Sequence, residues 1–119
     1  MKFILQLEEA AMAAIAIYFL TFHSLGWSFW IWALLFFSPD ISMLGYLINT
    51  RVGAVTYNIF HHKGIALAVV AIGLLSQNEL LIAIGTLMFA HASFDRIFGY
   101  GLKYGDSFGN THLGRIGKG

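Results

Sequence analysis

Four apolar stretches, each close to the length that crosses a lipid bilayer, dominate this sequence. A transmembrane helix needs about 20 consecutive, mostly apolar residues. Hydrophobic residues make up 58% of the 119 residues and charged residues only 11%. The chain is therefore predicted to be a single integral membrane domain of the all-α class, residues 1–119. We expect its helices at about 3–24, 27–50, 53–75 and 80–101, followed by a polar tail at 102–119.

The turns between these stretches predict how the helices are arranged. Only a few residues separate consecutive helices, so neighbours should run up and down as an antiparallel four-helix transmembrane bundle. Pro39 falls inside the second helix, where it removes a backbone hydrogen bond and predicts a kink. Asp40 follows directly, and it could either cap the restarted half of the helix or act as a ligand.

The cationic residues indicate how the helices are oriented. One side holds both termini, the turn between the second and third helices, and Lys2, Arg51, Lys103, Arg115 and Lys118. The opposite side has neither lysine nor arginine. By the positive-inside rule, the N- and C-termini are predicted to be cytoplasmic. The net charge of +1 gives no reason to expect a nucleic-acid partner, so the lipid bilayer is the expected partner, and a homo-oligomer stays open.

Polar residues within the predicted helices share a depth. Counted from the cytoplasmic end of each helix at about 1.5 Å per residue, they fall at about 8 to 15 Å. Charges at membrane depth are costly and are normally paired, turned inward or functional. We therefore expect one intramembrane site near the cytoplasmic side, to which all four helices contribute. Its candidate residues are Glu8, Glu9, Asp40, His61, His62, His91 and Asp95.

Spacing and charge predict a metal ion in this site. His91 and Asp95 are four residues apart, so they share a helix face. Four intramembrane carboxylates face two cations, Lys63 and Arg96, and one divalent ion would balance the excess of two negative charges. The chain has no cysteine, so the ligands must be nitrogen and oxygen, a set that suits Zn, Mn or Fe. Such an ion with an open position can generate hydroxide near neutral pH, which predicts a hydrolase.

Two resemblances extend this interpretation. The segment HASFDRIFGYGLKYGDSF is similar to the signature of a family of short bacterial integral membrane proteins of unknown function, and this likeness covers nearly the whole chain. The segments SPDISMLGYL, YNIFHHKG and HASFD resemble, in the same order, the Pro-Asp-x-Asp, His-x-x-x-His type and His-x-x-x-Asp segments of the bacterial membrane-bound metal-dependent hydrolases. Ser42 stands where that pattern often has its second aspartate.

The hydrolase resemblance implies a set of roles. It implies a divalent metal ion, a lipid-like substrate and a location in the bacterial inner (plasma) membrane. Glu8 or Glu9 would be a further ligand or the general base. The implied metal ligands are Asp40, His61 or His62, His91 and Asp95.

Structural alternatives for these residues stay open. His61 and His62 could lie at the membrane surface if the third helix begins later than expected. Asp95 and Arg96 could pair with carboxylates or cations only to hold the helices together. We expect Arg96 to balance a carboxylate on the first helix.

Functional alternatives also stay open. The same site could relay protons or hold a cation in a transport protein, which would need to oligomerise because one chain is small for a pathway. His61 and His91 could instead bind haem, although haem ligation needs no carboxylate. In the polar tail, Asp106 and His112 could form a lid over the site or add a ligand.

Overall fold

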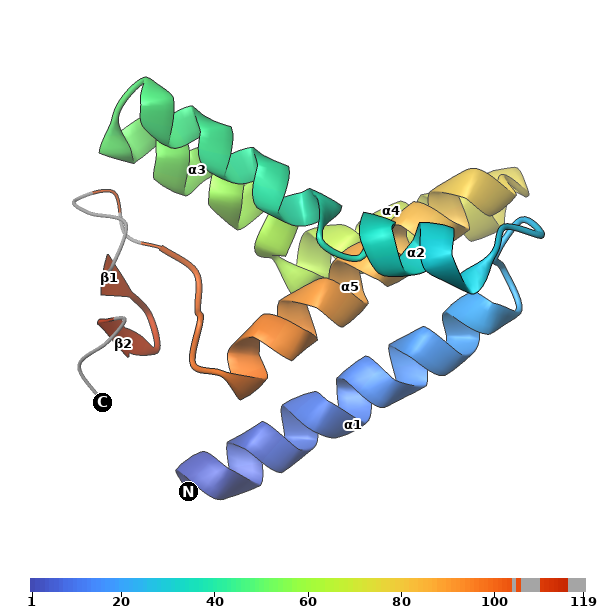
Figure 1. Cartoon of the computed structure of the whole chain (residues 1–119), viewed down its shortest axis with the longest axis horizontal. Coiled ribbons are helices and arrows are strands. Elements are labelled where there is room, and N and C mark those ends of the chain that lie inside the picture. The colour runs from blue at the N-terminus through green and yellow to red at the C-terminus, as the bar shows by residue number, and fades with distance from the viewer. Residues whose placement is uncertain (104, 106–109, 116–119) are drawn as a thin grey trace.

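Helices make up most of the chain, as shown in Figure 1. The computed structural model describes residues 1–103, 105 and 110–115. A short antiparallel ladder in the tail pairs Asn110 with Arg115 and Thr111 with Gly114. The elements in order are α1 (Lys2–Thr21), α2 (Phe29–Leu35), the 3₁₀ helix η1 (Ser38–Leu47), α3 (Thr50–His61), α4 (Lys63–Ser76), α5 (Glu79–Ile97), β1 (Asn110–Thr111) and β2 (Gly114–Arg115).

Three helical segments are long and apolar enough to cross a membrane. They are Lys2–Thr21, Phe29–Leu47 and Glu79–Ile97. Helices α3 and α4 are bent by 50° at the break between them, and together they would make a fourth span. These findings confirm the helical class and the membrane character, whereas the antiparallel four-helix bundle stays a prediction.

Helix α5 is the centre of the larger group of helices. It packs against α1 on one side and against α4 on another (Figure 1). Gly85 allows the close approach of α4, because a Cβ atom there would lie 2.7 Å from the Val70 backbone nitrogen. At one end of α1, Gln6 Nε2 donates to the Ile97 carbonyl at 2.8 Å. Beyond its other end, His23 Nδ1 lies 2.7 Å from Glu79 Oε2.

A second group consists of η1 and α3, which lie side by side in Figure 1. The Thr56 hydroxyl donates to the Ser42 carbonyl at 2.7 Å. Gly53 gives the Tyr46 ring room against α3, since any Cβ atom at that position would clash with the ring. The pair therefore holds Asp40, in the first turn of η1, close to the end of α3.

The expected second helix, 27–50, changes its geometry partway along. Ser28 caps α2 by accepting from the Ile31 N–H at 3.4 Å. Helix α2 ends at Leu35, and η1 begins at Ser38 with Pro39 in its first turn. Proline has no N–H to donate to a continuing α-helix, so the change from α to 3₁₀ geometry coincides with Pro39.

The expected third helix, 53–75, is divided at His62. Residue His62 has an extended backbone (φ −89°, ψ 117°), and its Nδ1 caps α4 by accepting from the Ile65 N–H at 3.2 Å. On the other side of the break, Arg96 Nη2 donates to the His61 carbonyl at 3.2 Å. A break at membrane depth needs such partners, because lipid cannot satisfy the freed backbone groups.

The tail after α5 returns to the helices. Lys103 forms a β-bridge with Thr111, and both residues are buried. The Asn58 side chain on α3 binds the Lys103 backbone twice, donating to its carbonyl at 2.7 Å and accepting from its N–H at 2.6 Å. The tail segment around Lys103 is therefore attached to α3.

Candidate metal centre

Four side chains from three elements converge at one point. They are Asp40 from η1, His61 from the last turn of α3, and His91 and Asp95 from α5. One ligand atom of each lies within 4.8 Å of all the others. The two histidines are only 2% and 1% exposed, whereas the Asp40 side chain is 35% exposed. We call these four residues the His/Asp cluster.

The histidine–aspartate distances within the His/Asp cluster fit one small metal ion. Asp40 Oδ1 lies 3.2 Å from Nε2 of both His61 and His91. Asp95 Oδ2 lies 3.4 Å from His61 Nε2 and 3.3 Å from His91 Nε2. Zinc binds nitrogen and oxygen at about 2.0–2.1 Å, which puts tetrahedral ligand atoms about 3.3–3.4 Å apart. Each histidine–aspartate distance therefore fits a site of that size.

Backbone carbonyls orient both histidine rings. His61 Nδ1 donates to the Tyr57 carbonyl at 2.8 Å, and His91 Nδ1 donates to the Phe36 carbonyl at 2.7 Å. A carbonyl can only accept, so both Nδ1 atoms carry hydrogen and both Nε2 atoms face the carboxylates. Histidines that bind metals usually have this outer hydrogen bond, which fixes the ring and the tautomer.

The charge of the His/Asp cluster requires a cation or extra protons. With neutral rings, two Nε2 lone pairs and two carboxylates would face one another with no donor between them. A divalent ion would neutralise the two carboxylates. The other solution is to protonate both rings, which would give two imidazolium–carboxylate pairs. Both solutions are neutral overall, as burial in a membrane favours.

Aromatic rings surround the cluster and limit the access of water. The Tyr57 ring stacks on His61, with centroids 3.8 Å apart and an angle of 8° between the planes. The Phe36 ring lies 5.3 Å from the His91 ring. Because Tyr57 and Phe36 also supply the two carbonyls, these two residues both orient and cover the histidines.

Three of the sequence-predicted residues lie outside the His/Asp cluster. His62 is exposed and caps α4. Glu9 binds Lys63, whose Nζ lies 2.7 Å and 2.8 Å from its two carboxylate oxygens. Glu8 is exposed on α1. Lys63 makes the direct ion pair with Glu9, and the negative charge of Glu9 also acts on Arg96, although no carboxylate of the described residues lies within ion-pair distance of Arg96.

Lys103 is a residue near the site that the sequence did not indicate. Its side chain is buried, and its Nζ lies 4.4 Å from the centroid of the Tyr57 ring that covers His61. Burial lowers the pKa of Lys103, while the negative charges of Asp95 and Asp40 act in the opposite direction. No periodic pattern could have revealed this contact, because the tail follows α5 and returns to α3.

His112 holds the tail in place rather than joining the His/Asp cluster. The backbone N–H of His112 donates to the Leu102 carbonyl at 2.9 Å, and the ring Nδ1 of His112 accepts from the Leu102 N–H at 2.7 Å. Burial, followed by the positive charge of Arg96, lowers the pKa of His112. Asp106, the other tail residue considered, lies outside the described residues.

The arrangement also bears on the haem alternative. The His61 and His91 ring centroids are 5.0 Å apart, and the Nε2 atom of each ring lies 3.2–3.4 Å from the Asp40 and Asp95 carboxylates. A porphyrin between the two histidines would have to occupy the space of these carboxylates. The geometry therefore suits a small ion better than a haem.

Comparison with known proteins gives a family but no activity. A family model described as a domain of unknown function (DUF4260) matches residues 2–116, so the chain belongs to this family. Neither a curated protein nor a solved structure matches the chain. The function must therefore be argued from the His/Asp cluster and its surroundings.

Proposed function

We propose that this DUF4260 protein is a metal-dependent hydrolase of the membrane, in which Asp40, His61, His91 and Asp95 hold one divalent ion of the Zn, Mn or Fe type. The observation that supports this most is the set of four distances of 3.2–3.4 Å between the Nε2 and carboxylate atoms. The two carbonyl hydrogen bonds to the histidine Nδ1 atoms add a second, independent sign of metal ligation.

Asp40 marks the open side of the site. A catalytic ion needs a position for water beside its protein ligands, and such an ion supplies activated water near neutral pH. Asp40 is the most exposed of the four side chains, so water and substrate can reach the cluster there. Its Oδ1 faces the two histidines, so its other carboxylate oxygen can accept a proton from the water. Hydrolysis of an ester breaks the acyl C–O bond, puts the hydroxyl on the acyl carbon and a proton on the leaving oxygen.

The proposal includes a membrane topology. We propose four spans in up-and-down order, with α3 and α4 as one bent span and both termini in the cytoplasm of a bacterial cell. The Gln6–Ile97 hydrogen bond brings the start of the chain to the end of α5. A Cβ atom on Gly105 would lie 3.4 Å from Arg51 Cγ, so the tail and the start of α3 are also neighbours. The cations of these three regions thus gather on one side, as the positive-inside rule requires.

An activity assay on defined lipids tests the proposed reaction. Bound metal is first removed from the protein with a chelator, and the protein is reconstituted into phospholipid nanodiscs. Zinc, manganese or iron is then added in turn, and mass spectrometry identifies any released fatty acids and headgroups. We expect one of the metals to restore product formation, and His91→Ala to abolish it. Glu79→Gln is the matched control, because Glu79 is exposed, lies at the opposite end of α5 and is outside the cluster. Fully metal-loaded protein that releases no product from any lipid would refute the hydrolase function.

A further inference from the structure

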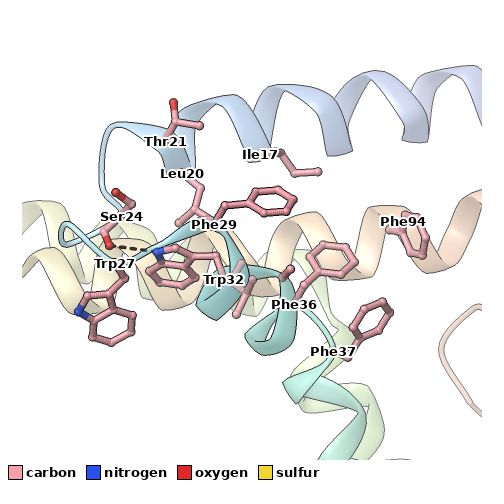
Figure 2. Close-up of a pocket in the computed structure, with 12 residues that line it drawn as sticks. Ile17, Leu20, Thr21, Ser24, Trp27, Phe29, Trp32, Phe36, Phe37 and Phe94 are labelled. Carbon is pink, nitrogen blue, oxygen red and sulfur yellow. Dashed lines mark hydrogen bonds between the residues drawn. The ribbon is translucent and has the colours of Figure 1, made fainter.

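An apolar groove lies between α1, α2 and α5 (Figure 2). Its volume is about 520 Å³, which is within the usual range of ligand pockets. The walls include Ile17 and Leu20 from α1, Trp32 from α2 with Phe36 directly after it, and Leu87 and Phe94 from α5. Leu87 and Phe94 are seven residues apart, so the groove follows α5 for about 10 Å.

The lining of the groove is almost entirely apolar. None of the twelve residues that line it is charged. Trp32 Nε1 donates to the Ser24 carbonyl at 3.0 Å, the dashed line in Figure 2. The Thr21 hydroxyl donates to the Tyr18 carbonyl at 2.6 Å. Because these polar groups already have partners, a molecule in the groove must be largely hydrocarbon.

One end of the groove touches the residues that position the His/Asp cluster. Phe36 and Phe37 line this end (Figure 2). The Phe36 carbonyl accepts from His91 Nδ1, and the rings of Phe36 and Phe37 lie 5.3 Å and 6.4 Å from the His91 ring. The Phe37 carbonyl accepts from the Asp40 N–H at 3.1 Å. The groove and the cluster are therefore neighbours, with Phe36 and Phe37 between them.

The apolar groove and the neighbouring His/Asp cluster together are complementary to an amphiphile, a molecule with a hydrocarbon part and a polar part. Two walls of the groove belong to α1 and α5, both candidate membrane spans, so the groove lies at the depth of lipid hydrocarbon. The charged His/Asp cluster lies beyond the end of the groove at Phe36 and Phe37, and the His23–Glu79 pair lies next to Ser24 at the other end. We propose that the groove binds one hydrocarbon chain of a membrane phospholipid and brings the polar linkage of that lipid to Asp40, the most exposed member of the His/Asp cluster. The reaction at that linkage rests on the proposed function, whereas the chain site rests on the groove alone.

Photo-crosslinking in nanodiscs tests the chain site. The probe is a phospholipid with a diazirine in one acyl chain, and crosslinked residues are mapped by mass spectrometry. We expect labels to concentrate on groove residues and to saturate as the probe concentration rises. Ala33→Trp fills the groove and should lower labelling there about tenfold or more. Leu34→Trp is the matched control, because Leu34 is 78% exposed, lies on the same helix and does not line the groove.

A variant on the opposite wall and a metal measurement complete the test. Ile17→Trp narrows the groove from α1, so it tests the site even if Ala33→Trp does not fold. Labels spread evenly over lipid-facing residues and unchanged in both groove variants would overturn the chain site. A free photoreactive fatty acid that labels the groove when the phospholipid does not would also overturn it. Elemental analysis of the same samples separates the two proposals: bound metal without groove labelling leaves the metal centre standing, and groove labelling without metal leaves the chain site standing.

Discussion

His61 and His62 are neighbours in the sequence, but they have different roles in the structure. His61 is buried with its Nε2 facing Asp40 and Asp95, whereas His62 is exposed and caps α4. The sequence predicted a similar depth for both and left open which one faces the site. The choice depends on the helix break, because the break ends α3 at His61 and turns the next residue away.

Replacing each of these histidines by alanine should separate the two roles. His61→Ala removes a ligand, and we expect the affinity for zinc to fall by more than about 100-fold. Substitutions of residues that only support the ligands already lower metal affinity by up to about 100-fold. His62→Ala should keep the metal and lose about 1 kcal/mol of stability through the missing cap. Metal titration and thermal unfolding measure the two effects. Equal metal affinities in the two variants would contradict the assignment.

The residues that support the cluster could not be predicted in the same way. Asp40, His61, His91 and Asp95 stand out because ionisable groups are rare at membrane depth. Tyr57 and Phe36 act through their backbone carbonyls, which every residue has. Lys103 reaches Tyr57 only because Asn58 binds the tail 45 residues further along the chain. Such contacts leave no local signal in a sequence.

At the scale of elements, the break between α3 and α4 is the least expected feature. The residues around His62 include no proline, and the apolar pattern continues on both sides. What holds the break is tertiary: Arg96 on α5 binds the His61 carbonyl, and Glu9 on α1 binds Lys63 at the start of α4. By contrast, the sequence contains Pro39 close to the change from α2 to η1, while the kink predicted at this proline stays a prediction.

Removing the Arg96 side chain should destabilise this break. Arg96→Met leaves the His61 carbonyl without its donor, and an unsatisfied buried acceptor costs about 1–3 kcal/mol. Arg51→Met is the control, because Arg51 is exposed at the start of α3. Thermal unfolding in detergent should show a clear loss of stability for the first variant and little change for the second. Equal loss in both would argue against a role for Arg96 at the break.

The tail should open as the pH falls. His112 accepts a hydrogen bond at Nδ1, and its pKa is lowered in the folded protein by burial and by Arg96. Only the neutral His112 ring can accept this hydrogen bond from the Leu102 N–H. The contact therefore contributes its full stability to the folded tail above about pH 6.5, the ordinary pKa of histidine, and this stability is lost as the pH falls below that value. Hydrogen exchange of the Leu102 amide should lose protection in this range.

The Lys103 amide provides the internal reference for this measurement. The Lys103 N–H donates to the Asn58 side chain rather than to a titrating group. Its protection from hydrogen exchange should therefore fall less steeply than that of the Leu102 amide, and at a lower pH. In His112→Ala, the pH dependence at Leu102 should disappear. Protection at Leu102 that stays constant from neutral pH to about pH 5 would rule out the histidine as the pH-sensitive contact.

At the scale of the whole molecule, the sequence predicted helical segments that are long and apolar enough to cross a membrane, because the bilayer fixes the length and composition such segments need. It did not predict how they group. The structure places α1, α4 and α5 together and pairs η1 with α3, and the His/Asp cluster lies where the two groups meet. That grouping depends on close approaches at glycines such as Gly53 and Gly85, which apolar periodicity does not reveal.

The proposed topology can be tested with single cysteines, because the natural chain has none. Phe22→Cys follows α1, and Thr50→Cys begins α3, and both positions are exposed. We expect a membrane-impermeant maleimide to label position 22 in intact spheroplasts and position 50 only after the membrane is opened. The reverse pattern would place both termini outside the cytoplasm.

The central claim is that the His/Asp cluster holds a metal ion, and elemental analysis of the protein tests it most directly. The protein is purified in detergent without a histidine tag, beside a His91→Ala/Asp95→Ala double variant whose helical content is checked by circular dichroism. We expect about one divalent ion per chain in the unchanged protein and almost none in the double variant. A folded parent that contains no metal, and binds none when zinc, manganese or iron is supplied, would contradict it and favour two imidazolium–carboxylate pairs instead.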